Sequence, residues 1–199
     1  MNKELLPKGF LRKHPLAQYS AASFADLGIR IIHADELNEE IDKIVSPTIE
    51  ASRRAAVLQE KKQIDALNTP EAVVAQMRKD TDVLNQNPLC KKALSMQDEV
   101  LPLILKRYKS TFQVYFVETS VRILGNADRK YTAELLDMYK EIRNPYAQSM
   151  ACLLFGEHEL EEAVPLLLSE FERLKKQYPD ESYDQGPLLA LHIMYGEET

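Results

Sequence analysis

Apolar residues recur along most of the chain at intervals of three and four positions, which is the spacing of one face of an α-helix. From residue 35 onward, short polar or proline-containing segments separate the apolar runs. Three of these segments pair a capping side chain with a proline suited to the first helical turn: Ser46-Pro47, Thr69-Pro70 and Asn87-Pro88. We therefore predict helices over 47–67, 70–84 and 88–96, and an all-α fold.

The second half of the chain carries a degenerate internal repeat. The segments 99–109, 131–142 and 162–174 each contain two adjacent leucines, or a leucine and an isoleucine, with an aromatic residue about one helical turn later. Each is followed by an apolar segment that closes with a glycine: Gly125, Gly156 and Gly196. These glycines are about 30 to 40 residues apart, which is the length of a helical repeat unit.

Glycine and proline set the predicted boundaries of the repeated helices. A glycine after a helix commonly adopts the left-handed conformation that ends it, and proline is tolerated in the first helical turn. We predict that Gly156 ends one helix, that Pro165 opens the next, and that Pro102 holds the same place as Pro165. Stacked antiparallel pairs then bury their apolar faces. The predicted fold is an α-α superhelix over 97–199, with an additional helical N-terminal region over 1–96 packed on it.

One stretch combines an Asn-Pro turn, small residues along the helix that follows, and the opening of the next helix: Asn144-Pro145, Ala147, Ala151, Gly156 and 162–166. This stretch resembles HEAT-like helical repeats, of the short-unit type also found in relatives of phycobilisome lyases, and 97–196 resembles them more loosely. Gln148 stands where the repeat usually has an arginine. The resemblance implies a solenoid and says almost nothing about chemistry, because a fold does not determine a function.

The charge of the chain argues against nucleic acid as its partner. The 199 residues carry a net charge of −6, and the segment after residue 143 is strongly acidic. An acidic surface repels phosphate backbones. We therefore do not expect the protein to bind nucleic acid.

The cysteines and the lengths of the apolar runs indicate in which cellular compartment the protein works. Cys90 and Cys152 are the only cysteines, and Cys152 lies in an apolar run where it is expected to be buried. This usage suits a reducing compartment. No apolar run approaches the length of a membrane span, and the first residues lack the apolar stretch of a signal peptide. We expect a cytoplasmic protein with no membrane contact.

We find no catalytic or metal-binding motif. The glycines form no phosphate-binding cluster. His158-Glu159 begins like a zincin motif, but Glu162 stands where that motif needs its second histidine. The acidic loop over 177–187 lacks the spacing of a calcium-binding EF-hand loop. We predict no catalytic residue, no metal ligand and no cofactor, with His158 and Glu162 in a salt bridge or a solvated turn.

The predicted binding surface lies on the second helix of each repeat, because these helices normally line the concave face of such solenoids. In the helix over 111–124, Tyr115, Glu118 and Arg122 share one stripe. Counting back from the terminal glycines pairs Tyr146 with Tyr115 and Ser149 with Glu118. Tyrosine and arginine are enriched at interfaces. The full predicted set is Tyr115, Glu118, Arg122, Tyr146, Gln148 and Ser149. The alternative is that the two tyrosines only pack within the stack.

A second partner surface is predicted at the C-terminal helix over 187–195. This segment is apolar nearly all round, and such a helix must be covered on more than one side. Either the N-terminal ninety or so residues cover it, or it forms the interface of a homodimer.

The leading functional hypothesis is a non-catalytic module that binds a protein or peptide along its stacked helices. The alternative is a HEAT-like DNA-alkylation-repair glycosylase, or another enzyme acting on nucleic acid. The chain has no tryptophan, although such enzymes often use tryptophan around a catalytic carboxylate. A third hypothesis, a lyase or chaperone for a tetrapyrrole, follows only from the resemblance to phycobilisome-lyase repeats.

Overall fold

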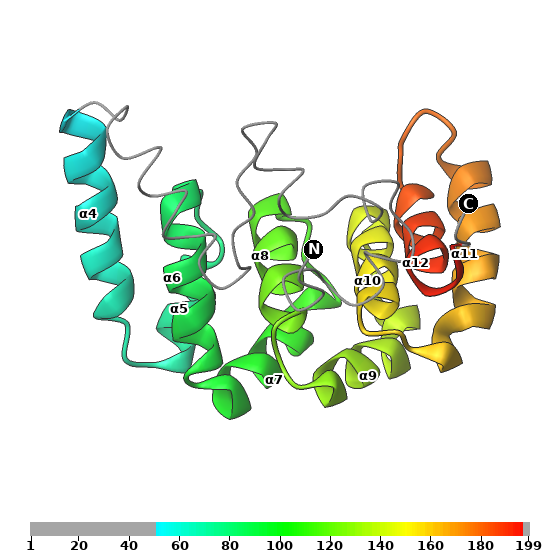
Figure 1. Cartoon of the computed structure of the whole chain (residues 1–199), viewed down its shortest axis with the longest axis horizontal. Helices are drawn as coiled ribbons and strands as arrows, with labels where there is room; N and C mark the ends of the chain where they lie inside the picture. Colours follow the sequence, from blue (N-terminus) through cyan, green and yellow to red (C-terminus); the bar gives the residue numbers. More distant parts are fainter. Residues whose placement is uncertain (1–50, 197–199) are drawn as a thin grey trace, which may run out of the picture. The chain divides into compact units, whose positions relative to one another are not determined.

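The computed structural model describes residues 51–196 (Figure 1). Within that range the chain forms nine α-helices and two short 3₁₀-helices, and no β-strand. The prediction of an all-α fold is therefore confirmed for this part of the protein. The helix start predicted at Ser46-Pro47 and the expectations for 1–50 lie outside the described residues.

The elements follow one another with short connections. The α-helices are α4 (Ala51–Asp65), α5 (Pro70–Gln76), α6 (Val83–Leu94), α7 (Gln97–Tyr108), α8 (Val114–Leu124), α9 (Arg129–Asp137), α10 (Pro145–Glu157), α11 (Val164–Gln177) and α12 (Gln185–Tyr195). The 3₁₀-helices are η5 (Tyr139–Glu141) and η6 (Glu161–Ala163). By its internal contacts, the chain from Ala55 to Tyr195 forms one compact unit, which is the unit described below.

Capping side chains begin several helices, as the sequence indicates. Thr69 accepts a hydrogen bond from the backbone N–H of Ala72 at the start of α5 (3.2 Å). Asn144 accepts one from the backbone N–H of Tyr146 at the start of α10 (3.0 Å), and Pro145 occupies the first turn. Both satisfy amide groups that have no partner inside the helix. Asn144-Pro145 is thus a true helix start.

Two predicted helix starts were wrong because proline is tolerated more deeply than expected. Asp82, whose Oδ1 accepts from the N–H of Leu84 (3.0 Å), begins α6 well before Pro88, which lies inside the helix. Pro102 likewise lies inside α7 rather than in its first turn. Each proline removes one intrahelical N–H donor. Pro165 does lie in the first turn of α11, as predicted.

Two of the glycines predicted to end helices, Gly125 and Gly156, do not act through the left-handed conformation. Gly125 caps α8 in the right-handed region (φ −65°), and Gly156 lies within the last turn of α10. The left-handed residue is Glu159 (φ 51°). The N–H of Glu159 bonds to the carbonyl of Gly156 (3.0 Å) and that of Leu160 to the carbonyl of Phe155 (2.9 Å), which is the Schellman pattern of helix termination.

Alternate helices pack in sequence. α6 packs on α8, α8 on α10, and α10 on α12 (Figure 1). The helices between them contact this row: α7 touches α6 and α8, α9 touches α8 and α10, and α11 touches α12, while α5 packs on α7. One apolar core runs through all of them, from Ile64 to Ala190. The boundary predicted between residues 96 and 97 falls inside this unit, because α5 and α6 share the core with α7 and α8.

Candidate interaction surface

Helix α8 separates its side chains into a buried face and an exposed face. Phe116 and Val117 are fully buried on the first face. On the other, Val114 and Tyr115 keep about half of their surface exposed (51% and 48%), and Glu118 and Arg122 are exposed as well. The stripe predicted from the sequence therefore faces away from the core. Exposed aliphatic and aromatic side chains beside charged ones are typical of interaction surfaces.

Tyr146 joins this stripe from the neighbouring helix. Its Oη donates a hydrogen bond to Glu118 Oε1 (3.0 Å), across 28 positions of sequence. Burial raises the pKa of Tyr146 to about 12, and the bond to the Glu118 carboxylate and the charge of that group add to the shift. The hydroxyl therefore stays protonated at neutral pH and acts as the donor. The structure brings together Tyr146 and the Glu118 side chain, as expected for one surface shared by α8 and α10.

Two tyrosines that the sequence analysis missed extend this surface. The ring of Tyr183 lies 6.4 Å from that of Tyr146, and the ring of Tyr178 lies 5.5 Å from that of Tyr183. Both come from the connection between α11 and α12, which the sequence indicated only as an acidic loop. The aromatic content of that loop was the available clue. We call Tyr115, Glu118, Tyr146, Tyr178 and Tyr183 the tyrosine surface.

Arg122 and Ser149, two further members of the predicted binding set, have different surroundings. Arg122 is exposed near the end of α8, where its carbonyl accepts a bond from Asn126 Nδ2 (2.8 Å). Ser149 is only 6% exposed. A Cβ on Gly186 would lie 2.0 Å from the Ser149 carbonyl oxygen, so the start of α12 packs directly over it. Ser149 was predicted on the binding surface, but it is buried beneath the start of α12 and is not exposed beside Tyr146.

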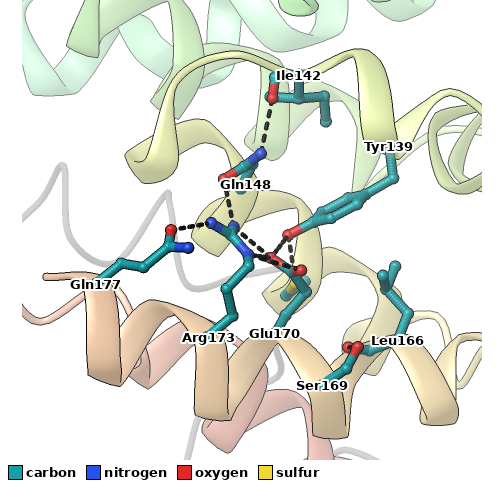
Figure 2. A network of polar contacts seen from close by, with 9 residues as sticks. Tyr139, Ile142, Gln148, Leu166, Ser169, Glu170, Arg173 and Gln177 are labelled. Carbon is teal, nitrogen blue, oxygen red and sulfur yellow. Dashed lines mark hydrogen bonds and ion pairs between the residues drawn. The ribbon is translucent and has the colours of Figure 1, made fainter.

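Gln148 belongs to a polar network between helices rather than to the tyrosine surface. Figure 2 shows its side chain between the backbone of Ile142 and the guanidinium group of Arg173. Its Nε2 donates to the Ile142 carbonyl (2.7 Å), and its Oε1 accepts from Arg173 (2.7 Å). A glutamine here uses both ends of its amide to join α10 to its neighbours.

Glu170 is the centre of the same network. This carboxylate is 8% exposed and accepts hydrogen bonds from Tyr139 Oη (2.8 Å) and from Arg173 Nε (2.9 Å) (Figure 2). Arg173 also donates to Gln177 Oε1 (2.7 Å). Burial raises the pKa of Tyr139, and the Cys152 thiol and the Glu170 carboxylate add to that effect. Since the buried charges and hydroxyl are satisfied by one another, the network serves to hold η5, α10 and α11 together.

His158 contacts the end of α8 rather than forming the salt bridge with Glu162 that was one of the two predicted arrangements. It caps the end of α10, and its Nε2 lies 3.2 Å from the Gly125 carbonyl oxygen at the end of α8. Glu162 lies in η6, on the next element. Among the residues that the structure describes, no group of three or more His, Cys, Asp or Glu side chains is placed to hold a metal ion.

The C-terminal helix α12 is not buried all round. Gly186, Pro187 and Ala190 are buried, and α10 and α11 both pack on the helix. Leu188 and Leu189 remain 48% and 45% exposed. The homodimer predicted through 187–195 stays a prediction.

Of the helices within 51–196, none combines the length and the apolar character that crossing a lipid bilayer requires. Compared with protein-family models, with curated proteins and with solved structures, the chain matches none of them.

Proposed function

We propose that the protein is a non-catalytic interaction module that binds a segment of another protein on the tyrosine surface. The observation that carries this proposal is the bond between Tyr146 and Glu118, which joins a half-buried tyrosine of α10 to an exposed carboxylate of α8. Tyrosine supplies a large contact area with little loss of side-chain entropy, and it is enriched at binding hot spots.

The proposed scaffold is a HEAT-like superhelix. The successive packing of α6, α8, α10 and α12 supports it, as do the intervening helices that contact this row. The Asn144-Pro145 helix start supports it as well. In such a stack, equivalent positions of adjacent helices fall side by side, which suits recognition of an extended segment.

Site-specific photo-cross-linking in the native cell tests the function. A photoreactive phenylalanine analogue replaces Tyr115 in one variant and the exposed Lys140, which lies in η5, in a control variant. We expect discrete protein cross-links from position 115 that are absent from position 140. Equal cross-linking from both positions, or none from position 115, would contradict the proposal. Cross-links that disappear after nuclease treatment would instead favour an activity on nucleic acid.

A further inference from the structure

A groove lies between α5, α7 and the connection that leads into α8. Its volume is about 730 Å³, which is within the range of about 300–1,000 Å³ that is typical of ligand sites. Val74, which is buried, and Leu103, which is half-buried, supply apolar walls. Phe112, on its lining, is 67% exposed. An exposed phenylalanine beside a groove offers an apolar contact to a bound ligand.

The charged side chains that line the groove are mainly basic. Arg78 comes from α5, and Lys106 and Arg107 come from adjacent positions of α7, whereas Glu71 is the acidic member. Within residues 51–196, Lys109, Lys130 and Arg173 form ion pairs. None of the three groove cations forms an ion pair with another residue of that range. Three positive charges concentrated in one cleft of an acidic protein attract an acidic ligand.

Two of these cations are held in place by contacts that leave their charge available. Arg78 Nε donates to Gln113 Oε1 (2.8 Å), which ties α5 to the connection before α8. The Arg107 guanidinium lies over the ring of Phe116, 5.7 Å from its centroid. Both contacts restrict a long side chain without neutralising it. An arginine fixed in this way loses less entropy when it pairs with a carboxylate.

We propose that this groove binds an acidic peptide segment that carries an aromatic or large aliphatic side chain. Carboxylates of the segment pair with Arg78, Lys106 and Arg107, and its apolar side chain packs against Phe112. A peptide is favoured over a nucleic acid because Glu71 would repel a continuous phosphate backbone. The groove residues are not part of the tyrosine surface, so this second proposed site does not rest on the proposed function.

Selection from a random heptapeptide library displayed on phage tests the proposal with the full chain as target. We expect the enriched peptides to carry an excess of Asp and Glu around Phe, Leu or Tyr. One enriched peptide, made with a fluorescent label, is then titrated by anisotropy. Lys106→Glu should weaken its binding about tenfold, because one attractive charge becomes repulsive, and added salt should weaken it further. Phe112→Ser should also weaken it.

Lys140→Glu is the matched control, since it makes the same change in net charge at an exposed position outside the groove. It should bind the peptide as the unaltered protein does. The proposal is overturned if no peptide is enriched, if the enriched peptides have no acidic bias, or if the two charge reversals weaken binding equally. It is also overturned if a mixed-sequence single-stranded DNA 12-mer displaces the peptide at comparable concentration, which would assign the groove to phosphodiesters.

Discussion

Gly156, in the last turn of α10, lies with its backbone directly against that of Ala190 in α12. A Cβ at position 156 would fall 2.4 Å from the Ala190 Cα, and Gly186 makes a similar approach to Ser149 at the other end of the contact. The pairs 149–186 and 156–190 ascend together in sequence, so the two helices run in the same general direction. Two glycines therefore set how closely α10 and α12 pack.

Gly156→Ala is expected to lower the free energy of unfolding by at least about 2 kcal/mol, because the new methyl group overlaps backbone atoms that cannot rotate away. Urea denaturation followed by circular dichroism measures this. Gly125→Ala is the control. Its Cβ would meet neighbours at 3.2–3.4 Å, one of them the flexible Glu157 side chain, and its right-handed φ suits alanine. Its stability should change by less than about 1 kcal/mol. Equal losses in the two variants would argue against close packing as the role of Gly156.

Pro102→Ala is expected to stabilise the protein. Pro102 is exposed inside α7, so its ring contributes little packing, while its missing N–H leaves the carbonyl four residues earlier without its helical donor. Proline also restricts the unfolded chain, so replacing it removes a small stabilising effect. The expected net gain in the free energy of unfolding is about 1–2 kcal/mol. Pro165→Ala, in the first turn of α11, should not show such a gain. Thermal and urea unfolding of both variants provide the comparison.

The positions of the helices were largely predictable from the sequence, but the roles of individual glycines and prolines were not. Apolar spacing located the helices from α7 to α12, since each buries one face in a common core. Pro88 and Pro102 were misplaced because tertiary packing can maintain a helix through a proline. Gly156 was identified as important for the wrong reason, because a close approach between two helices depends on the partner helix and leaves no local pattern.

The candidate surfaces were predictable only in part. Helical spacing correctly placed Tyr115 and Glu118 on one exposed face, and alignment of the repeats brought in Tyr146. Ser149 could not be recognised as buried, since the residue that covers it comes from α12. The basic groove escaped notice because its cations come from separate helices. A site assembled from three elements becomes visible only once their packing is known.

Glu170→Ala should be strongly destabilising because it leaves Tyr139 and Arg173 without their shared acceptor. We expect a loss of about 2–3 kcal/mol, somewhat below that for a fully buried pair because Arg173 is half-buried. Tyr139→Phe removes one bond and should cost about 1 kcal/mol. The double variant should lose less than the sum of the two, since both remove the same bond.

Glu172→Ala is the control for that series, because Glu172 is an exposed carboxylate on the same helix. Its effect should stay within about 0.5 kcal/mol. Strict additivity of Tyr139→Phe and Glu170→Ala in urea denaturation would show that the two side chains act independently, and the network would then not be the unit that the geometry indicates.

Stability should fall as the pH rises above about 9, and Cys152 should account for part of the fall. Burial raises the pKa of this thiol from its ordinary value of 9.0 to about 12. Above pH 9 the unfolded state loses the proton while the folded state keeps it, so the contribution is fully present below pH 9 and is lost between about 9 and 12. One group changes the free energy of unfolding by at most about 1.4 kcal/mol per pH unit.

Cys152→Ala tests this assignment through the slope of stability against pH rather than through stability itself. The variant leaves a small cavity and should be less stable at every pH, but its free energy of unfolding should fall less steeply from pH 9 to pH 11 than that of the unaltered protein. Burial also raises the pKa of tyrosines such as Tyr139. The stability of both proteins should therefore still fall to some extent as the pH rises. Urea denaturation across this range gives the free energy of unfolding of each protein as a function of pH. If the two curves are parallel, the Cys152 thiol does not titrate differently in the folded and unfolded states.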